Sequence, residues 1–367
     1  MSNDSTKNDN VLRPVSISLL YDGMVVQDDI YDATGDRMLI KAGNELGVLQ
    51  IERIMNLNNN RDTIYVTGRT QKAMASKRPP DIEVESRTEV EEATGYAETK
   101  NETFEILEKI SNSKTVDQAS LKEASSKLSN KLETTPPTVI ISLINAMAPV
   151  DEYLQRHCVN VSLLNGLIGM WMGLPKEEVD KLVLIGLLHD SGKSLLPPAV
   201  LNVPRRLTKV EFEVIKMHTV YTYELLKDFP EDIRISAASH HEKLNGKGYP
   251  QALSDDAVPR YARITAVTDI YDAMVSQRAY KQARGPFSIL ALIKKLSVSE
   301  LDNDIINIFI ENMPKELMNK PVMMSDGTIG VIKEFDPNDI EFPTVELGKR
   351  LVKTTENLQC VSMFTDE

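Results

Sequence analysis

The chain is 367 residues long, with 41% hydrophobic residues, 26% charged residues and a formal net charge of −12 at pH 7. This length suits two or three domains of ordinary size, and the negative charge argues against a protein that grips a nucleic-acid polymer by neutralising its phosphates. The N-terminus, MSNDSTKNDN, lacks the apolar core of a signal peptide. The longest apolar stretch, near residues 139–150, falls short of the about 20 residues that span a bilayer. We therefore expect a soluble, cytoplasmic protein without a membrane span.

The first hundred residues divide into three parts by composition. Residues 1–10 are polar and predict a disordered leader. Residues 11–66 alternate short apolar runs with turn signals, which predicts a small α/β, β-rich module with a helix over 48–57 and a closing strand at 63–66. Residues 67–100 are charged and poor in large apolar side chains, which indicates a linker.

The rest of the chain is expected to be mainly helical and to end in a β segment. Residues 101–149 recover helical spacing and predict a helical connector, and residues 150–313 predict an α-helical domain. Residues 314–367 return to strand alternation around a hairpin signal at Asp326-Gly327, which predicts a short β appendage.

All histidines of the chain fall within 85 consecutive residues of the expected helical domain. They are His157, His189, His218, His240 and His241. A single histidine on an apolar helix is more often a core residue than a ligand. Five in one domain beside carboxylates favour a metal site instead, because imidazole and carboxylate groups bind first-row transition metals. His189 is expected where a helix ends, and His218 in a helix that begins at Thr208 and whose apolar face includes Phe212. Several helices would then supply one centre.

Short motifs follow one another in a fixed order through this domain. They are His189-Asp190-Ser191-Gly192-Lys193, His218, His240-His241-Glu242, Gly248-Tyr249-Pro250, Asp269 and Arg278-Ala279-Tyr280-Lys281. The HD pair or the GYP triplet alone would be a weak signal, whereas the ordered set is specific. With this set the sequence resembles the HD-GYP family over roughly residues 150–313, less than half of the chain. The N-terminal module resembles the segment often found ahead of such domains, and no site is carried over from it.

The resemblance implies an α-helical HD-type catalytic domain with metal-dependent phosphodiesterase activity. The implied substrate is cyclic di-GMP, hydrolysed to linear pGpG, and more slowly to GMP, by attack of a metal-activated hydroxide. The implied metal ligands are His157, His189, Asp190, His218, His240, His241 and Asp269. Asp190 would bridge two metals, because each of its two oxygens can reach a different ion.

The resemblance also implies which residues meet the substrate. Lys193 would be catalytic and would contact the scissile phosphate. Tyr249 would lie in a glycine-rich loop close to the ligand, and Arg278 and Lys281 would bind the second phosphate or the guanine edges.

One departure from the family pattern concerns the number of metals. Tyr153 stands one helical turn before His157, where some members carry a glutamate associated with a third metal. A phenol is a poor ligand at neutral pH because its pKa is about 10. We therefore expect two transition-metal ions, iron or manganese, and no third. Asp272 is expected to support a ligand, and Cys158 to be a packed thiol.

Three alternatives stay open at this point. The domain could hydrolyse another nucleotide, such as an alarmone or a nucleoside triphosphate, or it could act on cyclic GMP-AMP. It could also be a catalytically idle receptor for a cyclic dinucleotide. The sequence does not decide which signal the N-terminal module receives. It does not decide the oligomeric state either, and a homodimer is one possibility.

Overall fold

The computed structural model describes residues 13–16, 25–27, 29–31, 38–44, 46, 63–67, 96–145, 153–201, 207–275, 285–296 and 299–363. By residue contacts the chain divides into two compact units, the first built mainly from residues 1–82 and the second mainly from residues 83–367. The leader expected at 1–10, the helix expected over 48–57 and most of the linker expected at 67–100 lie outside the described residues.

The first unit contains short antiparallel strands. Its three-stranded sheet has the order β1-β5-β2, and a further pair joins β3 to β4. The strands are β1 (Arg13–Ser16), β2 (Val25–Val26), β3 (Ile30–Tyr31), β4 (Met38–Ile40) and β5 (Thr63–Thr67). The closing strand expected at 63–66 is confirmed by β5, which pairs with both β1 and β2.

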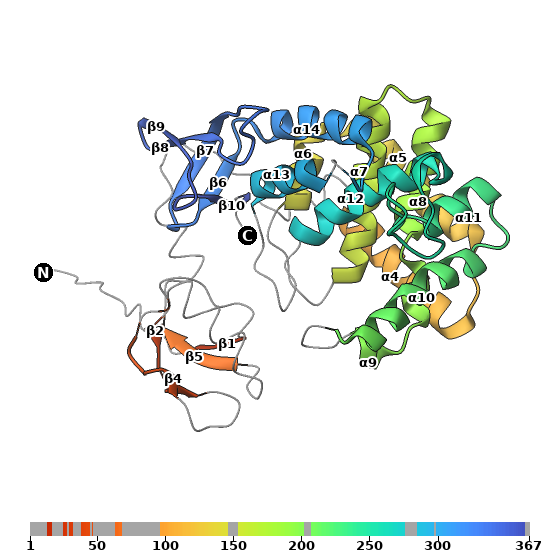
Figure 1. Ribbon diagram of the computed structural model, residues 1–367, viewed down its shortest axis with the longest axis horizontal. Coiled ribbons are helices and arrows are strands. Elements are labelled where there is room, and N and C mark those ends of the chain that lie inside the picture. Colours follow the sequence, from red (N-terminus) through yellow and green to blue (C-terminus); the bar gives the residue numbers. More distant parts are fainter. Residues whose placement is uncertain are drawn as a thin grey trace, which may run out of the picture. The chain divides into compact units, whose positions relative to one another are not determined.

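The second unit is mainly helical (Figure 1). Its helices are α4 (Tyr96–Ser113), α5 (Gln118–Thr134), α6 (Pro137–Asn145), α7 (Tyr153–Trp171), α8 (Lys176–Leu188), α9 (Pro198–Leu201), α10 (Lys209–Leu225), α11 (Glu231–Ala238), α12 (Arg260–Val275), α13 (Pro286–Leu296) and α14 (Asn303–Leu317), with short 3₁₀ helices η3 (Ser191–Leu195) and η4 (Asp255–Ala257). None of the helices in the described part of the chain combines the length and apolar character needed to cross a membrane.

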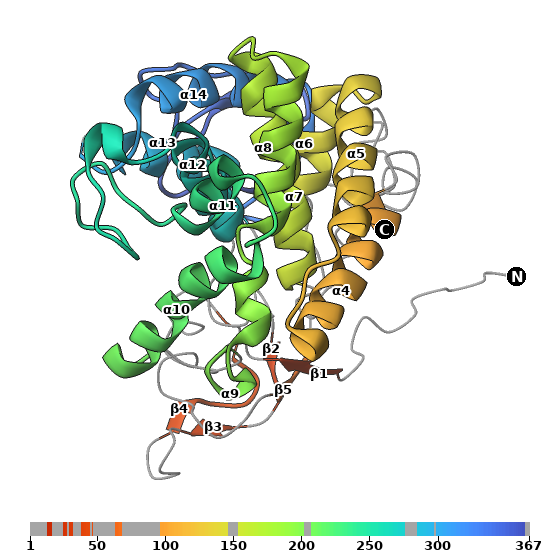
Figure 2. The same cartoon turned by 90° about the vertical axis from the view of Figure 1, so that its right-hand side faces the viewer.

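Helices α7 and α8 pack side by side (Figure 2). Gly186 of α8 permits this approach, because a Cβ at that position would lie 2.5 Å from Cα of Ser162 in α7. Ser162 donates a hydrogen bond of 2.6 Å to the carbonyl of Val183, and Asn165 donates one of 3.0 Å to the carbonyl of Leu182. These contacts fix the relative position of the two helices that carry the first two histidines.

One hydrophobic core serves the whole second unit, and it extends from Tyr96 in α4 to Met363 in the last strand. Helix α4 begins at Tyr96, inside the range expected to be a linker, and Tyr96 is only 1% exposed. Helix α6, expected in the connector, buries Ile140, Ile141 and Ile144 in the same core. We therefore propose that residues 96–145 belong to the helical body rather than to a separate connector.

The C-terminal segment forms a five-stranded antiparallel sheet in the order β10-β6-β7-β8-β9. Its strands are β6 (Pro321–Met324), β7 (Ile329–Glu334), β8 (Thr344–Leu347), β9 (Arg350–Lys353) and β10 (Cys360–Met363). The hairpin signal at Asp326-Gly327 is confirmed, since β6 and β7 pair across it and Gly327 has a φ of 77°. Val322, Ile332 and Val345 of this sheet join the core of the helical body.

Phe212, expected on the apolar face of its helix, is an exposed aromatic residue. Helix α10 does begin after Thr208, whose hydroxyl accepts a hydrogen bond from the backbone of Glu211 and caps the helix. However, the buried residues of α10, which are His218, Thr219, Thr222 and Leu225, all lie in its second half. Phe212 lies near the start of the helix, seven residues before Thr219, and is 44% exposed.

Candidate metal centre

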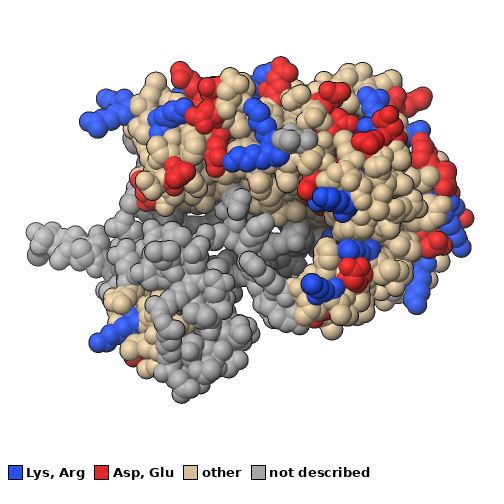
Figure 3. Space-filling view, in the orientation of Figure 1, with Lys and Arg blue, Asp and Glu red and all other residues tan. Residues whose placement is uncertain are grey.

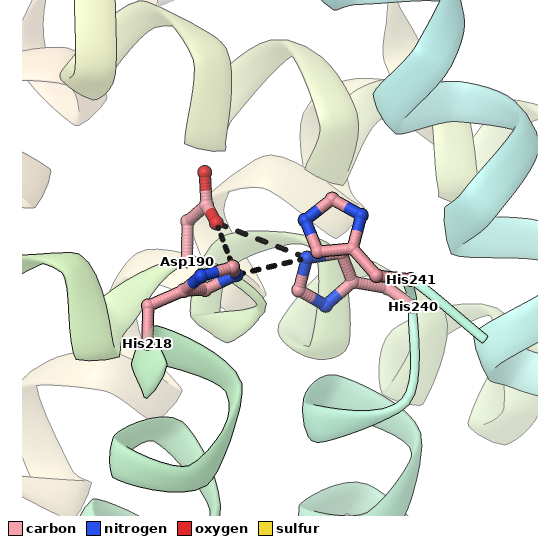
Figure 4. Close-up of side chains that lie close together, drawn as sticks. All are labelled: Asp190, His218, His240 and His241. Atoms are coloured by element: carbon pink, nitrogen blue, oxygen red, sulfur yellow. Dashed lines mark hydrogen bonds and ion pairs between the residues drawn. The ribbon is translucent and has the colours of Figure 1, made fainter. Parts of the chain in front are cut away.

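Residues from five helical segments converge on one buried cluster. His157 lies in α7 and Asp269 in α12, whereas His218 lies in α10. His189-Asp190 follow the last residue of α8, and His240-His241 follow α11. The structure therefore brings together all seven residues expected to be metal ligands, and Figure 4 shows four of them, Asp190, His218, His240 and His241, side by side.

Three of the imidazoles are held by the backbone of their own helices. Nδ1 of His189, His218 and His240 each lies 2.7 Å from the carbonyl oxygen of the residue three positions earlier. A carbonyl can only accept, so Nδ1 carries the proton and donates. The lone pair of each imidazole is therefore on Nε2, which points into the cluster and is available to a metal.

His157 is held differently, by a carboxylate. Its Nδ1 lies 2.7 Å from Oδ2 of Asp272, and both side chains are fully buried. A carboxylate behind a histidine fixes the orientation of the ring and makes it a better ligand. The support expected from Asp272 thus falls on His157, whose Nε2 faces Oδ1 of Asp269 at 3.1 Å.

Asp190 stands between two groups of histidines. Its Oδ1 lies 3.4 Å from Nε2 of His218 and 3.8 Å from Nε2 of His240. Its Oδ2 lies 3.5 Å from Nε2 of His157 and 3.5 Å from Nε2 of His189. Each oxygen thus faces its own pair of imidazoles, which is the arrangement that a bridging carboxylate requires.

Asp269 closes the cluster on its other side. Its Oδ1 lies 4.0 Å from Nε2 of His189, in addition to its contact with His157, and its Oδ2 lies 3.6 Å from Nδ1 of His241. His241 therefore presents Nδ1 rather than Nε2 to the carboxylate. Asp269 is also only slightly exposed, which keeps its charge within the cluster.

One buried atom of the cluster indicates that a cation fits there. Oδ1 of Asp190 is buried and has no hydrogen-bond partner within the described residues. Leaving a buried carboxylate oxygen unpaired is costly. The donors around it are neutral imidazole nitrogens and carboxylate oxygens, which suit iron, manganese or zinc. The residues present therefore fit the metal pair that the sequence resemblance implies.

The protonation states agree with such a site. Burial lowers the pKa of His189, His218 and His240 to about 4 in each case, so all three are neutral at pH 7. Burial also pulls down the pKa of His157, but its bonds to Asp269 and Asp272 outweigh burial and raise the pKa to about 9. His157 therefore carries an extra proton at neutral pH when no metal competes for Nε2.

Lys193 contacts the bridging carboxylate directly. It lies in η3, three residues after Asp190, and its Nζ forms an ion pair with Oδ2 of Asp190. Burial raises the pKa of Asp190, but the charge of Lys193 and the neighbouring imidazoles outweigh it and hold the pKa well below its usual range. The Lys193 side chain is 18% exposed, so it lies at the edge of the cluster where an anionic substrate could reach it.

A glycine sets the distance between η3 and α10. A Cβ on Gly192 would lie 2.1 Å from the carbonyl oxygen of His218 and 2.6 Å from the backbone nitrogen of Thr222. The hydroxyl of Thr222 accepts from the Gly192 amide at 3.0 Å and donates to the carbonyl of His189 at 3.2 Å. This close packing holds Asp190 beside His218.

The GYP loop lies against the histidines. The ring of Tyr249 lies 4.7 Å from the ring of His241, centroid to centroid. Glu242, which is 2% exposed, accepts hydrogen bonds from the backbone amides of Gln251 (2.6 Å) and Leu253 (2.9 Å). The sequence motif included Glu242 but did not predict this role, which is to hold the loop that carries Tyr249.

A rim of two aromatic rings and one lysine lies next to this loop. The ring of Phe212 is 6.3 Å from that of Tyr249 in an edge-to-face arrangement. Nζ of Lys216 lies 5.0 Å from the centre of the Phe212 ring and 5.6 Å from that of Tyr249. Neither Lys216 nor the contact of Phe212 with Tyr249 was expected from the sequence, because only the fold of the loop against α10 brings them together.

The structure does not place every predicted residue. Arg278 and Lys281 lie outside the described residues. Tyr153 is the first residue of α7, but its side chain is not among those described. On the face drawn in Figure 3, Lys and Arg alternate with Asp and Glu over the described surface of the helical body. Of the described cations, Lys193 pairs with Asp190, and Nζ of Lys216 lies 5.6 Å from the centre of the Tyr249 ring.

Comparison with known proteins agrees with this geometry. The family model described as "HD domain" matches residues 139–305. The cyclic di-GMP phosphodiesterase response regulator RpfG of Xanthomonas campestris pv. campestris is 36% identical over 158 residues, which are 42% of this chain and 42% of that protein. The cyclic di-GMP phosphodiesterase PA4108 of Pseudomonas aeruginosa is 29% identical over 217 residues, 58% of this chain and 51% of that protein. The matched region thus spans about half the length of these relatives.

A solved structure shares the fold. Bd1817, an HDG"Y"P protein from Bdellovibrio bacteriovorus, superposes with a TM-score of 0.50 at 13% identity, over 81% of this chain and 98% of the other. The segment that matches the HD domain, residues 139–305, contains the buried His189-Asp190 pair. Its ordered HD, HHE and GYP motifs and its cyclic di-GMP phosphodiesterase relatives are consistent with the HD-GYP family.

Proposed function

We propose that this chain is a metal-dependent phosphodiesterase that hydrolyses cyclic di-GMP. The observation that carries the proposal is Asp190, whose two buried oxygens each face a separate pair of imidazole Nε2 atoms. The names of RpfG and PA4108, both cyclic di-GMP phosphodiesterases, support the choice of substrate. A receptor that only binds a cyclic dinucleotide has no need of a complete set of metal ligands, so the proposal favours an enzyme.

The proposed centre holds two transition-metal ions, iron or manganese. Five imidazoles in the donor set argue against magnesium, which prefers oxygen ligands. One ion would be held by His157, His189, Asp190 and Asp269, and the other by Asp190, His218, His240 and His241. A bound pair of such ions lowers the pKa of water to near neutrality and neutralises phosphoryl oxygens during in-line displacement.

The side chains around the centre would hold the substrate. We assign the scissile phosphate to Lys193, because its side chain is partly exposed and its ammonium group can leave Asp190 to bind a phosphate oxygen. We assign one guanine base to the rim formed by Phe212, Lys216 and Tyr249, because an exposed ring can stack on a base. Arg278 and Lys281 are assigned to the second phosphate on the strength of the sequence resemblance alone.

The proposed main product is linear pGpG, with slower conversion to GMP. A second cut needs the terminal phosphate of pGpG held in a new register, and two metals offer fewer anchors than three. Tyr153, in place of a carboxylate, supports the two-metal site because a phenol remains protonated at neutral pH.

A panel of nucleotides tests the proposal. Purified protein loaded with Mn²⁺ or Fe²⁺ is incubated with cyclic di-GMP, cyclic GMP-AMP, an alarmone and a nucleoside triphosphate, and products are followed by chromatography. We expect cyclic di-GMP to be consumed fastest and pGpG to accumulate before GMP. Preferred cleavage of another nucleotide would reassign the substrate. Binding of cyclic di-GMP without cleavage by the metal-loaded protein would make the chain a receptor, and prompt GMP without pGpG would contradict the product assignment.

A further inference from the structure

A continuous chain of buried hydrogen bonds connects the first residue of α4 with a proposed metal ligand. The hydroxyl of Tyr96 donates to Oδ1 of Asn160 at 2.7 Å. Nδ2 of Asn160 donates to Oδ1 of Asp272 at 2.7 Å, and Oδ2 of Asp272 lies 2.7 Å from Nδ1 of His157. All four side chains are at most 1% exposed, and they come from α4, α7 and α12.

The donors and acceptors of these hydrogen bonds fit in one arrangement. Asp272 accepts at both oxygens, one from Asn160 and one from His157. Asn160 can present its NH₂ group to Asp272 only while its carbonyl oxygen faces the other way. There it accepts the hydroxyl proton of Tyr96, so Tyr96 stabilises the amide orientation that Asp272 needs.

The consequence for His157 is a fixed ring. With Oδ1 of Asp272 bound to Asn160, Oδ2 is directed at Nδ1 of His157, and Nε2 of the same ring is aimed at Asp269, Asp190 and His189. Other histidines of the cluster use a carbonyl of their own helix for this purpose. Nδ1 is hydrogen-bonded in four described histidines, namely His157, His189, His218 and His240. Of these four, His157 alone depends on a side chain from a distant part of the sequence.

We infer that Tyr96 is a positioning residue for the metal ligand His157, acting through Asn160 and Asp272. This inference rests on the proposed function, which makes His157 a ligand. Tyr96 lies outside the segment that matches the HD domain, 139–305. It is also the first described residue of the helical body. The residues that order the metal site therefore extend beyond the HD domain to the start of α4.

The test compares two tyrosines that lose the same group. Tyr96→Phe removes the hydroxyl that donates to Asn160. Tyr271→Phe is the matched control, because the buried Tyr271 hydroxyl also donates to an asparagine Oδ1, that of Asn145, at 2.7 Å, but along a path that does not include His157. Asp272→Asn is the positive control, since an amide offers only one acceptor where two are needed.

Two measurements are made on the full chain. Titration of the metal-free protein with Mn²⁺ gives the affinity of each ion, and ¹H–¹⁵N NMR of labelled histidine follows exchange of the Nδ1 proton of His157 with water. Loss of a direct partner of a ligating histidine typically weakens metal binding about 10- to 100-fold, which we expect for Asp272→Asn. For Tyr96→Phe we expect a smaller loss, roughly 3- to 10-fold for one of the two ions, together with faster exchange of the His157 proton. Tyr271→Phe should change neither.

The outcomes separate this inference from the proposed function. If the parent protein binds two Mn²⁺ ions and Tyr96→Phe leaves both affinity and proton exchange unchanged, the positioning role is wrong and the proposed function stands. Equal effects of Tyr96→Phe and Tyr271→Phe would also overturn it, because they would reflect a general loss of stability. If the parent protein binds no Mn²⁺, the proposed function fails, and the proton exchange of His157 still decides whether Tyr96 orders the ring.

Discussion

Oδ1 of Asp190 lies 3.4 Å from Nε2 of His218, and neither atom is engaged by the backbone around it. The imidazole proton sits on Nδ1, where it is donated to the carbonyl of Ile215. Two acceptor atoms thus face each other in a buried place, which is unfavourable unless a cation lies between them. Four predictions follow from this cluster and the residues next to it.

Asp190→Asn should remove both metals. The carboxylate supplies the charge and one oxygen to each proposed ion, and an amide offers one neutral oxygen. We expect metal content, measured by elemental analysis, to fall from about two ions per chain to none, and hydrolysis to fall below detection. Asp180→Asn is the control. Asp180 lies in α8, the helix that precedes Asp190, and its exposed side chain pairs only with Lys176 among the contacts described. Retention of two ions by Asp190→Asn would rule out the bridge.

Lys193→Ala should separate metal binding from turnover. Its ammonium group competes with a metal for Oδ2 of Asp190, so its removal should leave metal content unchanged or make binding tighter. Loss of one preorganised charge at a reacting group typically lowers the rate about 10²- to 10³-fold, and we expect kcat to fall in that range. Lys181→Ala, which breaks an exposed ion pair with Asp232, should keep full activity. Loss of metal from Lys193→Ala would show that the lysine supports the centre instead of the substrate.

Metal uptake should release a proton at neutral pH. The pKa of His157 is raised to about 9, so at pH 7 its Nε2 carries a proton that a metal must displace. His189, His218 and His240, with pKa values lowered to about 4, have none to lose. Calorimetry of Mn²⁺ binding in buffers of different ionisation enthalpy should report about one proton from His157 at pH 7 and about half a proton from it at pH 9, in addition to any proton lost by metal-bound water. A release of zero at pH 7 would contradict the assignment of His157.

Phe212→Ala should weaken substrate binding without slowing the chemical step. Stacking of a base on an aromatic side chain is worth about 1–3 kcal/mol, so KM for cyclic di-GMP should rise roughly 5- to 150-fold while kcat stays near its original value. Val210→Ala is the control, because Val210 lies on the same helix and is 75% exposed. Steady-state kinetics on both variants decides the matter, and an unchanged KM for Phe212→Ala would remove Phe212 from the substrate site.

Much of the local structure follows from short stretches of sequence. Thr208 marks the start of α10 as expected, and the Asp326-Gly327 turn predicts the hairpin of β6 and β7. His189 lies where the apolar run of α8 ends, as expected. Caps, turns and periodicity depend on residues a few positions apart, so the sequence contains nearly all of the physics that decides them.

Other features depend on which helices meet, and the sequence by itself did not determine them. The exposure of Phe212 follows from its place along α10, whose buried residues all lie in the second half of the helix, and its contact with Tyr249 joins residues 37 positions apart. The chain from Tyr96 to His157 crosses three helices, with 112 positions between Asn160 and Asp272. The sequence named the histidines and carboxylates of the cluster through their order and type. Only tertiary packing, with α7 against α8 at Gly186 and η3 against α10 at Gly192, decided which oxygen of Asp190 faces which imidazole, because such directions are set by close contact between distant segments.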